Sequence, residues 1–267
     1  MQKRNSARQT PSIQSLDRGL AILKAVANRD CPVSLSELTD LLEIDRSSVF
    51  RLASTQRRGF LAYPTGGKDY VLGPSFWRLS HKYDWGKMLI RISHAHLKAL
   101  AAETNETAQV GAREDKQAVL IDSVTATNQI LCISGRIGQS TPLHCTAHRK
   151  GLIANLTTAQ LRELLGPEPL HQYARRIAKS IKELSKVRSS LKEHGFVTDD
   201  EEYHDGVRCV AAPILANDGQ ILGSIGISAP TIRFPVQRFD ECGAQVRRIA
   251  GENQQSAERN SRRLTTI

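Results

Sequence analysis

The sequence predicts an α+β protein in which an N-terminal winged helix-turn-helix is joined by linker helices to a larger α+β domain. Residues 13–74 contain three short helical patterns followed by a glycine-rich hairpin pattern. Beyond residue 105, strand and helix patterns follow one another without the regular β–α–β alternation that predicts a parallel sheet. A chain of 267 residues is long enough for two domains, each with its own core.

The composition is that of a globular protein with an excess of positive charge. Hydrophobic residues make up 40% of the chain, charged residues 24%, and the formal net charge is +10. Residues 1–85 hold 13 Lys and Arg against 8 Asp and Glu, so the first third of the chain carries +5 of that excess. A basic excess favours polyanionic partners such as nucleic acid.

Cysteine spacing and apolar runs restrict the cellular location. The five cysteines are odd in number and no two form a CxxC metal or redox motif, which indicates reduced thiols. No apolar run of signal-peptide length follows Met1, and no stretch approaches the roughly 18 apolar residues of a membrane span. We therefore expect a cytoplasmic protein without a membrane partner.

The first domain is expected to follow a flexible basic arm. Residues 1–12 are polar and basic and lack an apolar pattern. Apolar residues at helical spacing between Leu16 and Ala27 predict the first helix. The second helix begins after Ser34, which together with Glu37 has the spacing of a capping box, in which each side chain bonds the backbone N–H of the other residue.

A third helix and a hairpin complete the predicted first domain. The third helix comes after only a few residues, with Asp45 or Ser47 as its N-cap and Gly59 at its end. Two short apolar runs then flank Pro64–Gly67, a pattern typical of a β-hairpin. A tight turn between the second and third helices, with a hairpin directly after them, is the order of elements in a winged helix-turn-helix.

The third helix supplies the candidate DNA-reading side chains, because this helix enters the major groove in such domains. An arginine bonds guanine O6 and N7 with two hydrogen bonds, and serines bond several base edges or phosphate. The alternative is that these residues are solvated charges on an ordinary helical hairpin. The side chains expected to contact double-stranded DNA are Arg46, Ser47, Ser48, Arg51 and Ser54 of the helix and Lys68 of the wing.

The remaining chain predicts linker helices at residues 75–105, the second domain at residues 106–257 and a flexible tail at residues 258–267. The hairpin of the second domain is marked by the turn Asn217–Gly219. The elements expected in this domain are strands at 107–124 and 129–138, helices at 144–157 and 180–195, the hairpin at 209–230 and a final helix from 239.

Several motifs together resemble the IclR family of bacterial transcriptional regulators. They are SLDRGLAIL, SLSELTDLLEIDRSSVFRL, TPLHCTAHRKG, GFVTDDEEYHDGVRCVAAPI and GSIGISAP, and the resemblance covers about residues 13–255. It implies a DNA-binding winged domain and a GAF-like domain that binds a small organic acid or related metabolite. It also implies homodimers, often paired into dimers of dimers, no cofactor, and repression of an operator as the expected activity. Whether the effector relieves or causes repression stays open.

The resemblance further implies an effector pocket built from four segments of the second domain. Ile130 and Ile133 match positions that form an apolar wall, and Ala147 and His148 match a small pair whose backbone amides hold the ligand's carboxylate. Independently, a segment that leads into a helix offers unpaired N–H groups to an anion. The implied contact residues are Ile130, Ile133, Ala147, His148, Asp199, Val207, Cys209, Gly226 and Ser228.

Three positions depart from the family pattern. His148 and Arg149 stand where small residues are usual, which makes this end of the pocket tighter or more positive. Gly226 lacks the hydroxyl that serine supplies in some members. The third helix is one residue shorter than usual, and on a helix of 3.6 residues per turn the loss of one residue rotates the next part of the chain by about 100°.

Two other functions compete for the stretch DDEEYHDGVRC, residues 199–209. A metal-responsive regulator would use His144, His148, His204 and Cys209 as ligands. An enzyme would use the acids Asp199–Glu202 as acid and base, but four consecutive acids are normally solvated, and no catalytic elbow, Walker loop or Rossmann glycine pattern accompanies them. We therefore expect no enzymatic activity. A purely architectural DNA-binding protein is disfavoured by the size of the second domain.

Overall fold

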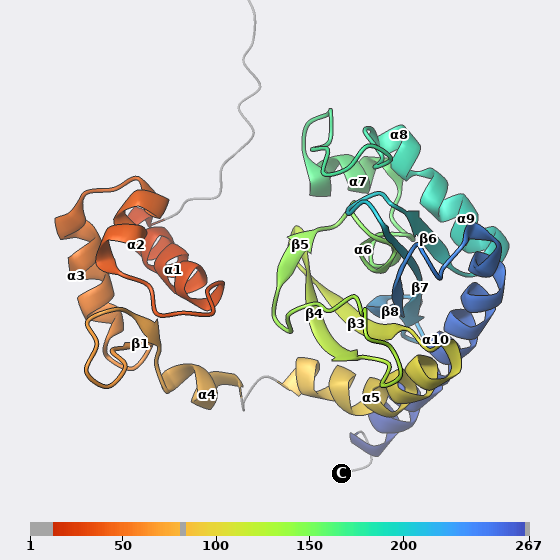
Figure 1. The fold of residues 1–267 in the computed structure, drawn as a ribbon, viewed down its shortest axis with the longest axis horizontal. Coiled ribbons are helices and arrows are strands. Elements are labelled where there is room, and N and C mark those ends of the chain that lie inside the picture. The colour runs from red at the N-terminus through yellow and green to blue at the C-terminus, as the bar shows by residue number, and fades with distance from the viewer. Residues whose placement is uncertain (1–12, 81–83, 265–267) are drawn as a thin grey trace, which may run out of the picture. The chain divides into compact units, whose positions relative to one another are not determined.

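The structure, a computed structural model, describes residues 13–80 and 84–264. The chain divides into two compact units, Met1–Asp84 and Trp85–Ile267 (Figure 1). The division falls inside the segment that the sequence predicts to link two domains. The predicted basic arm lies outside the described residues. No helix in the described ranges is both long and apolar enough to cross a membrane.

The first unit consists of three helices, a short hairpin and a fourth helix. In chain order these are α1 (Gln14–Ala27), α2 (Leu35–Leu42), α3 (Arg46–Gln56), β1 (Leu61–Ala62), β2 (Val71–Leu72) and α4 (Ser75–Ser80). The predicted capping box starts α2, because Ser34 N donates to Glu37 Oε2 at 2.8 Å and Glu37 N donates to Ser34 Oγ at 3.2 Å. Of the two candidate caps of α3, Asp45 caps the helix by accepting from Ser48 N at 2.9 Å.

One core holds these helices and the hairpin together. Ile22 of α1, Leu38 of α2 and Val49 of α3 are completely buried, and Tyr70 of the hairpin is 1% exposed. Tyr70 also pairs with Val33 through two backbone hydrogen bonds of 2.7 and 2.9 Å, which ties the hairpin to the start of α2. Full burial of each aliphatic side chain contributes about 1.5–3 kcal/mol, so this core fixes α3 relative to the hairpin.

The second unit is an α+β domain built on one antiparallel sheet of six strands, in the order β5-β4-β3-β8-β7-β6. Its strands are β3 (Thr107–Glu114), β4 (Gln117–Val124), β5 (Ser140–Pro142), β6 (Val197–Asp200), β7 (Val207–Leu215) and β8 (Ile221–Pro230). Its helices are α5 (Asp84–Thr104), α6 (Ala147–Gly151), α7 (Thr158–Leu165), α8 (Ile181–Leu184), α9 (Lys186–His194), the 3-10 turn η1 (Val236–Arg238) and α10 (Phe239–Leu264).

The two faces of the sheet have different coverings (Figure 1). Helices α5 and α10 pack on one face, where Leu97 and Val246 join Val110, Val210 and Ile227 in the largest core. Helix α6 packs on the opposite face, against β6, β7, β8 and β3. Since side chains alternate along a strand, the residues immediately before and after Val110, Val210 and Ile227 point toward α6. Asp199, Cys209 and Ser228, selected from the sequence as candidate pocket residues, lie on this second face.

Several predicted elements differ from the structure. The helix predicted over residues 144–157 is helical only at Ala147–Gly151, and the helix predicted over residues 180–195 is divided into α8 and α9. Residues 129–138 form no strand, and the edge of β4 is instead paired with the short β5, whose partner residues are Ser140–Pro142. The apolar run at residues 130–133 was misleading, because two glycines follow it: Gly138 has φ +84°, and a Cβ at Gly135 would lie 2.6 Å from a methyl of Leu120. At the end of the chain, α10 continues to Leu264, into the segment predicted as a flexible tail.

Candidate nucleic-acid interface and candidate ligand pocket

The outward face of α3 carries the polar residues selected from the sequence. With 3.6 residues per turn, Ser47, Arg51 and Ser54 fall in one stripe opposite the buried Val49 and Ala53. Ser47 and Arg51 are exposed, and Ser54 is half-buried. This stripe carries one guanidinium and two hydroxyls on the outward side of α3.

The start of α3 has a defined hydrogen-bonding arrangement. Asp45 accepts from Ser48 N and, at 2.6 Å, from the hydroxyl of Ser47. The Ser47 hydroxyl, followed by the Ser48 backbone N–H, holds the pKa of Asp45 well below its usual value, so Asp45 is ionised. The single hydroxyl proton of Ser47 is therefore engaged, and only the acceptor sites of this hydroxyl are available to a ligand. Arg46 and Lys68 are exposed.

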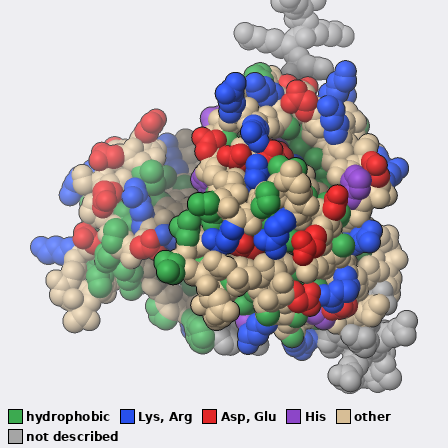
Figure 2. All heavy atoms as spheres, turned by 45° about the vertical axis from the view of Figure 1, so that its right-hand side comes forward, with side chains coloured by type: hydrophobic (Ala, Val, Ile, Leu, Met, Phe, Trp, Pro, Cys, Tyr) green, Lys and Arg blue, Asp and Glu red, His purple; other side chains and the backbone are tan. Residues whose placement is uncertain are grey.

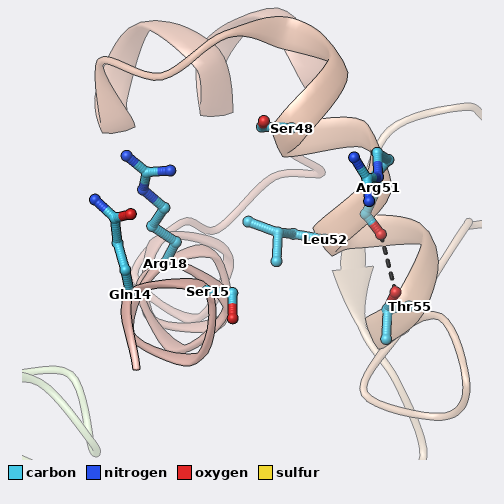
Figure 3. Close-up of a pocket in the computed structure, with 7 residues that line it drawn as sticks. All are labelled: Gln14, Ser15, Arg18, Ser48, Arg51, Leu52 and Thr55. Atoms are coloured by element: carbon cyan, nitrogen blue, oxygen red, sulfur yellow. Dashed lines mark hydrogen bonds between the residues drawn. The ribbon is translucent and has the colours of Figure 1, made fainter. Parts of the chain in front are cut away.

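A groove of about 280 Å³ lies between α1 and α3 (Figure 3). Its lining residues are Gln14, Ser15, Arg18, Ser48, Arg51, Leu52 and Thr55. Arg18 rises from α1 on one side and Arg51 stands on α3 at the other. Sequence reasoning selected Arg51 but missed Arg18 and Gln14, because nothing in the sequence indicates that this side of α1 lies beside the exposed face of α3.

In the second unit, three of the pocket residues selected from the sequence form one row across the sheet. Asp199 of β6 pairs with Cys209 of β7, and Cys209 pairs with Ser228 of β8. Directly paired residues on neighbouring strands share a face of the sheet. Asp199, Cys209 and Ser228 are 2–4% exposed, so the row is buried beneath α6. Val207, two residues before Cys209, points to the same face and is half-buried.

Ser228 is the centre of a buried polar cluster. Its Oγ lies 3.2 Å from Cys209 Sγ, 3.3 Å from Gln109 Oε1 and 3.4 Å from His148 Nε2. Gln109 comes from β3, about 120 residues earlier in the chain, and sequence reasoning missed it. No local motif identifies Gln109; its place results from its register with Gly226 on the neighbouring strand.

His148 contributes a neutral imidazole to this cluster. The side chain is buried, and burial, reinforced by the positive charge of Arg149, lowers the pKa of His148 to about 3. The preceding Ala147 is completely buried. The helix that carries both, α6, has only five residues, and the N–H groups of Arg149 and Lys150 both donate to the Thr146 carbonyl, at 3.1 and 2.9 Å. These two amides are therefore engaged within the protein.

Arg149 lies on the same short helix and is partly buried. Its Nη1 donates to Thr146 Oγ1 at 2.6 Å, and its Nε donates to the hydroxyl of Thr141. The guanidinium carbon lies 5.7 Å from the centroid of the Tyr203 ring. A cavity of about 20 Å³ adjoins the helix and is lined by Gln109, Gly111, Ala118, Val119, Leu120, His148, Arg149 and Leu152.

The run of acids in the second unit is paired rather than solvated. Asp199 Oδ1 accepts from Glu202 N at 2.8 Å, and burial raises the pKa of Asp199 to about 7 in spite of the nearby charge of Lys150. Lys150 Nζ lies 2.5 Å from Glu202 Oε1. Asp200 Oδ1 lies 2.6 Å from Arg208 Nε. The expectation of a solvated run is wrong for Asp199, which is buried. The other acids have basic partners: Lys150, distant in the sequence, and Arg208, eight residues after Asp200.

Comparison with known proteins decides the family. The family profile described as Bacterial transcriptional regulator IclR C-terminal matches residues 83–254, and the profile for the IclR helix-turn-helix domain matches residues 15–64. The chain belongs to the IclR family. The resemblance carried by the sequence motifs is thereby confirmed, together with the α+β fold and its N-terminal helix-turn-helix.

Similar IclR-family proteins are transcriptional regulators. The chain is 30% identical to the Transcriptional repressor IclR of Escherichia coli over 246 residues, 91% of this chain and 89% of that protein. It is 27% identical to the HTH-type transcriptional regulator KdgR of the same organism, over 91% and 92% of the two chains. The chain is thus a DNA-binding regulator rather than an enzyme.

Solved structures of the IclR family share the fold. A regulator from Alicyclobacillus acidocaldarius superposes with a TM-score of 0.78 at 19% identity, over 92% of this chain and all of the other. An IclR homologue from Microbacterium hydrocarbonoxydans, solved in complex with 4-hydroxybenzoate, superposes with a TM-score of 0.75 at 16% identity, over 91% and 99%.

Two pocket residues taken from the IclR family pattern lie away from the Ser228 cluster. Ile130 is fully exposed and Ile133 is half-buried, on the loop that sequence reasoning took for a strand. Neither lines the cavity beside α6, whose apolar wall comes instead from β4 and from Leu152. The structure therefore places Ile130 and Ile133 on a loop outside this cavity, and their role as an apolar wall stays a prediction.

This chain has Gly226 at a position where some IclR-family members have serine, and the structure gives a reason for the glycine. A Cβ at Gly226 would collide with the Val210 carbonyl oxygen and would lie 2.6 Å from Ala211 Cα. This position therefore supplies close packing between β7 and β8 instead of a hydroxyl.

The ligands of the metal alternative do not converge. His144 Nε2 lies 3.0 Å from the His171 carbonyl, while His204 is exposed and its ring lies 4.3 Å from that of Tyr203. Across residues 13–80 and 84–264, no group of three His, Cys, Asp or Glu side chains is arranged to hold a metal ion. The buried His148 and Cys209 instead bond Ser228.

Proposed function

We propose that the chain is an operator-binding repressor whose DNA affinity changes when a small organic acid binds beside the Ser228 cluster. The observation that carries this proposal is the convergence of Gln109, His148, Cys209 and Ser228, from three strands and α6, on one buried polar site. A few convergent polar groups beside an apolar wall are typical of small-molecule sites. The 4-hydroxybenzoate complex of the Microbacterium hydrocarbonoxydans homologue supports an acid as the ligand.

The alternation of side chains along β8 and β3 gives a route from the pocket to the linker. Ser228 and Gln109 face α6, while their neighbours Ile227 and Val110 pack in the core that includes α5. A ligand that binds one arrangement of these strands more tightly raises the population of that arrangement. Because α5 packs on the same strands, its preferred position changes with them. Because α5 comes directly after the first unit, this shift changes the spacing of two DNA-binding units in a homodimer, which reads two half-sites.

The DNA surface proposed for each half-site is the stripe of Ser47, Arg51 and Ser54, flanked by Arg46, Ser48 and Lys68. Arg51 is the base-reading residue, because it is exposed at the centre of the stripe. Arg18, across the groove from Arg51, contacts phosphate.

The experiment is a binding titration of the full chain on duplexes selected from a random DNA library. The proposal expects selection of a two-fold symmetric site and a change in its Kd when an organic acid is added. Recovery of no preferred site would refute the operator function. A preferred site whose Kd is insensitive to every acid that binds the protein would refute the effector function.

A further inference from the structure

Among the described side chains of the second unit, the partly buried cations are paired with carboxylates, with one exception. Arg233 binds Glu106 with two hydrogen bonds of 2.8 Å. Lys150 pairs with Glu202, and Arg208 pairs with Asp200. On the face visible in Figure 2, basic and acidic side chains of the larger unit are likewise interspersed. Arg149 differs, because its described partners are two threonine hydroxyls and the face of the Tyr203 ring.

This exception has an energetic cost. Removing a guanidinium from water is unfavourable unless an anion compensates it, and burial lowers the pKa of Arg149. The nearby acids have other partners, since Asp199 accepts from the Glu202 backbone and the Glu202 carboxylate pairs with Lys150. The cavity beside α6 therefore has one cation in its lining without a carboxylate partner among the described residues.

A second polar atom, on a residue that lines the same cavity, also has no hydrogen-bond partner in the described part of the chain. The Ser228 hydroxyl has a single proton, which it donates to Gln109 Oε1. The neutral His148 must then donate from Nε2 to Ser228, which makes Nδ1 an acceptor. Nδ1 is buried and has no hydrogen-bond partner among the residues that the structure describes. His148 lines the same cavity as Arg149.

We propose that the effector is a hydroxy monocarboxylate, whose carboxylate pairs with Arg149 and whose hydroxyl donates to His148 Nδ1. The inference rests on the proposed function and adds the residues that recognise the ligand. One cation without a carboxylate hydrogen-bond partner among the described side chains matches one negative charge. The cavity, about 20 Å³, holds about one water-sized group, so the ligand enters as the Arg149 side chain moves outward from its threonines.

The test is thermal unfolding of the full chain with two matched sets of probes at equal ionic strength. The compact set is glycolate, glycolamide and acetate; the aromatic set is 4-hydroxybenzoate, 4-hydroxybenzamide and benzoate. A ligand that binds the folded chain raises Tm with its concentration. We expect the hydroxy acid of at least one set to raise Tm and its neutral amide to leave Tm unchanged. The acid without the hydroxyl should bind at least about fivefold more weakly than the hydroxy acid.

The variants separate binding by Arg149 from a structural role. Arg149→Gln weakens binding of the hydroxy acid at least about tenfold, as expected for loss of a charged hydrogen-bonding partner. Arg149→Lys retains part of this affinity. Without ligand, Arg149→Gln keeps or raises Tm, since an uncompensated charge is removed, whereas a structural arginine would lower it. Arg176→Gln, which removes an exposed arginine paired with Asp200, is the matched control and leaves ligand binding unchanged.

Each contrary result overturns the inference. Equal Tm rises with acid and amide, an unchanged affinity in Arg149→Gln, or no rise with any probe would each show that Arg149 is not the counter-ion. If amides both bind and alter operator affinity, the regulator responds to a ligand as proposed and only the role of Arg149 is wrong. If no probe binds and operator affinity never changes, the proposed effector function fails as well.

Discussion

Substitution of Ser228 by alanine removes the centre of the buried cluster and leaves its neighbours without their hydrogen bonds. A hydroxyl has one donor and two acceptor sites, and the contacts to Gln109, Cys209 and His148 use all three. Leaving buried neutral polar groups unpaired costs about 1–3 kcal/mol. The distances, 3.2–3.4 Å, are at the long end for hydrogen bonds, so we expect Ser228→Ala to lower the free energy of unfolding of the second unit by about 1–2 kcal/mol.

The assay is urea unfolding, monitored by a signal from the second unit, with Ser54→Ala as the control. Ser54 is half-buried on the first unit, so its loss leaves the second unit unchanged. If Ser228→Ala lowers the free energy of unfolding by less than about 0.5 kcal/mol, the range of ordinary surface substitutions, the claim that Ser228 holds a hydrogen-bonded cluster is refuted. Ser228→Ala should also blunt the response of operator binding to ligand while basal operator affinity persists.

Three further substitutions test separate parts of the molecule. Arg51→Ala should weaken binding to the selected operator by about 1–3 kcal/mol and random DNA by less, measured by fluorescence anisotropy. Asp199 has a folded pKa of about 7, above its ordinary value of 3.8, so its stability contribution is largest at acid pH and falls as pH rises toward 7; Asp199→Asn should remove that fall in pH-dependent unfolding. Gly226→Ser should destabilise the second unit by about 1–3 kcal/mol, because its Cβ collides with β7.

Each of these measurements has a result that would contradict it. Equal losses on operator and random DNA would mean that Arg51 contacts only phosphate, and Arg29→Ala, an exposed arginine after α1, provides the baseline. An unchanged pH profile in Asp199→Asn would show that Asp199 ionises normally. A Gly226→Ser variant as stable as the original chain would mean that β7 and β8 can separate to admit a hydroxyl.

Local signals made the first unit predictable from the sequence. The capping box of Ser34 and Glu37 and the cap at Asp45 are contacts between residues three apart, and their spacing is visible in the sequence. The helical period separated the exposed Arg51 from the buried Val49. The groove between α1 and α3 was not predictable, since Arg18 reaches it only through the packing of the helices.

Several features of the second unit could not be predicted from the sequence. The segment around Ile130 has a short apolar run that is typical of a strand, yet β4 pairs with β5 instead, and two glycines follow the run, so the segment is a loop. Family motifs selected Asp199, Cys209 and Ser228, which the sheet register brings into one row. The place of Gln109 depends on a contact with a distant segment. The pairing of Arg149 with Thr141 and Thr146 is local, but no sequence pattern specifies that these threonines rather than a carboxylate are its partners.

The central claim is that a ligand in the buried pocket controls operator affinity, and a linked titration tests it most directly. The full chain is titrated onto its selected operator with and without the acid that gives the largest rise in Tm, and the Kd is measured by fluorescence anisotropy. We predict a change of at least about fivefold, the lower end of typical allosteric coupling, which is lost in Ser228→Ala. An unchanged Kd at a ligand concentration that saturates the rise in Tm would contradict it.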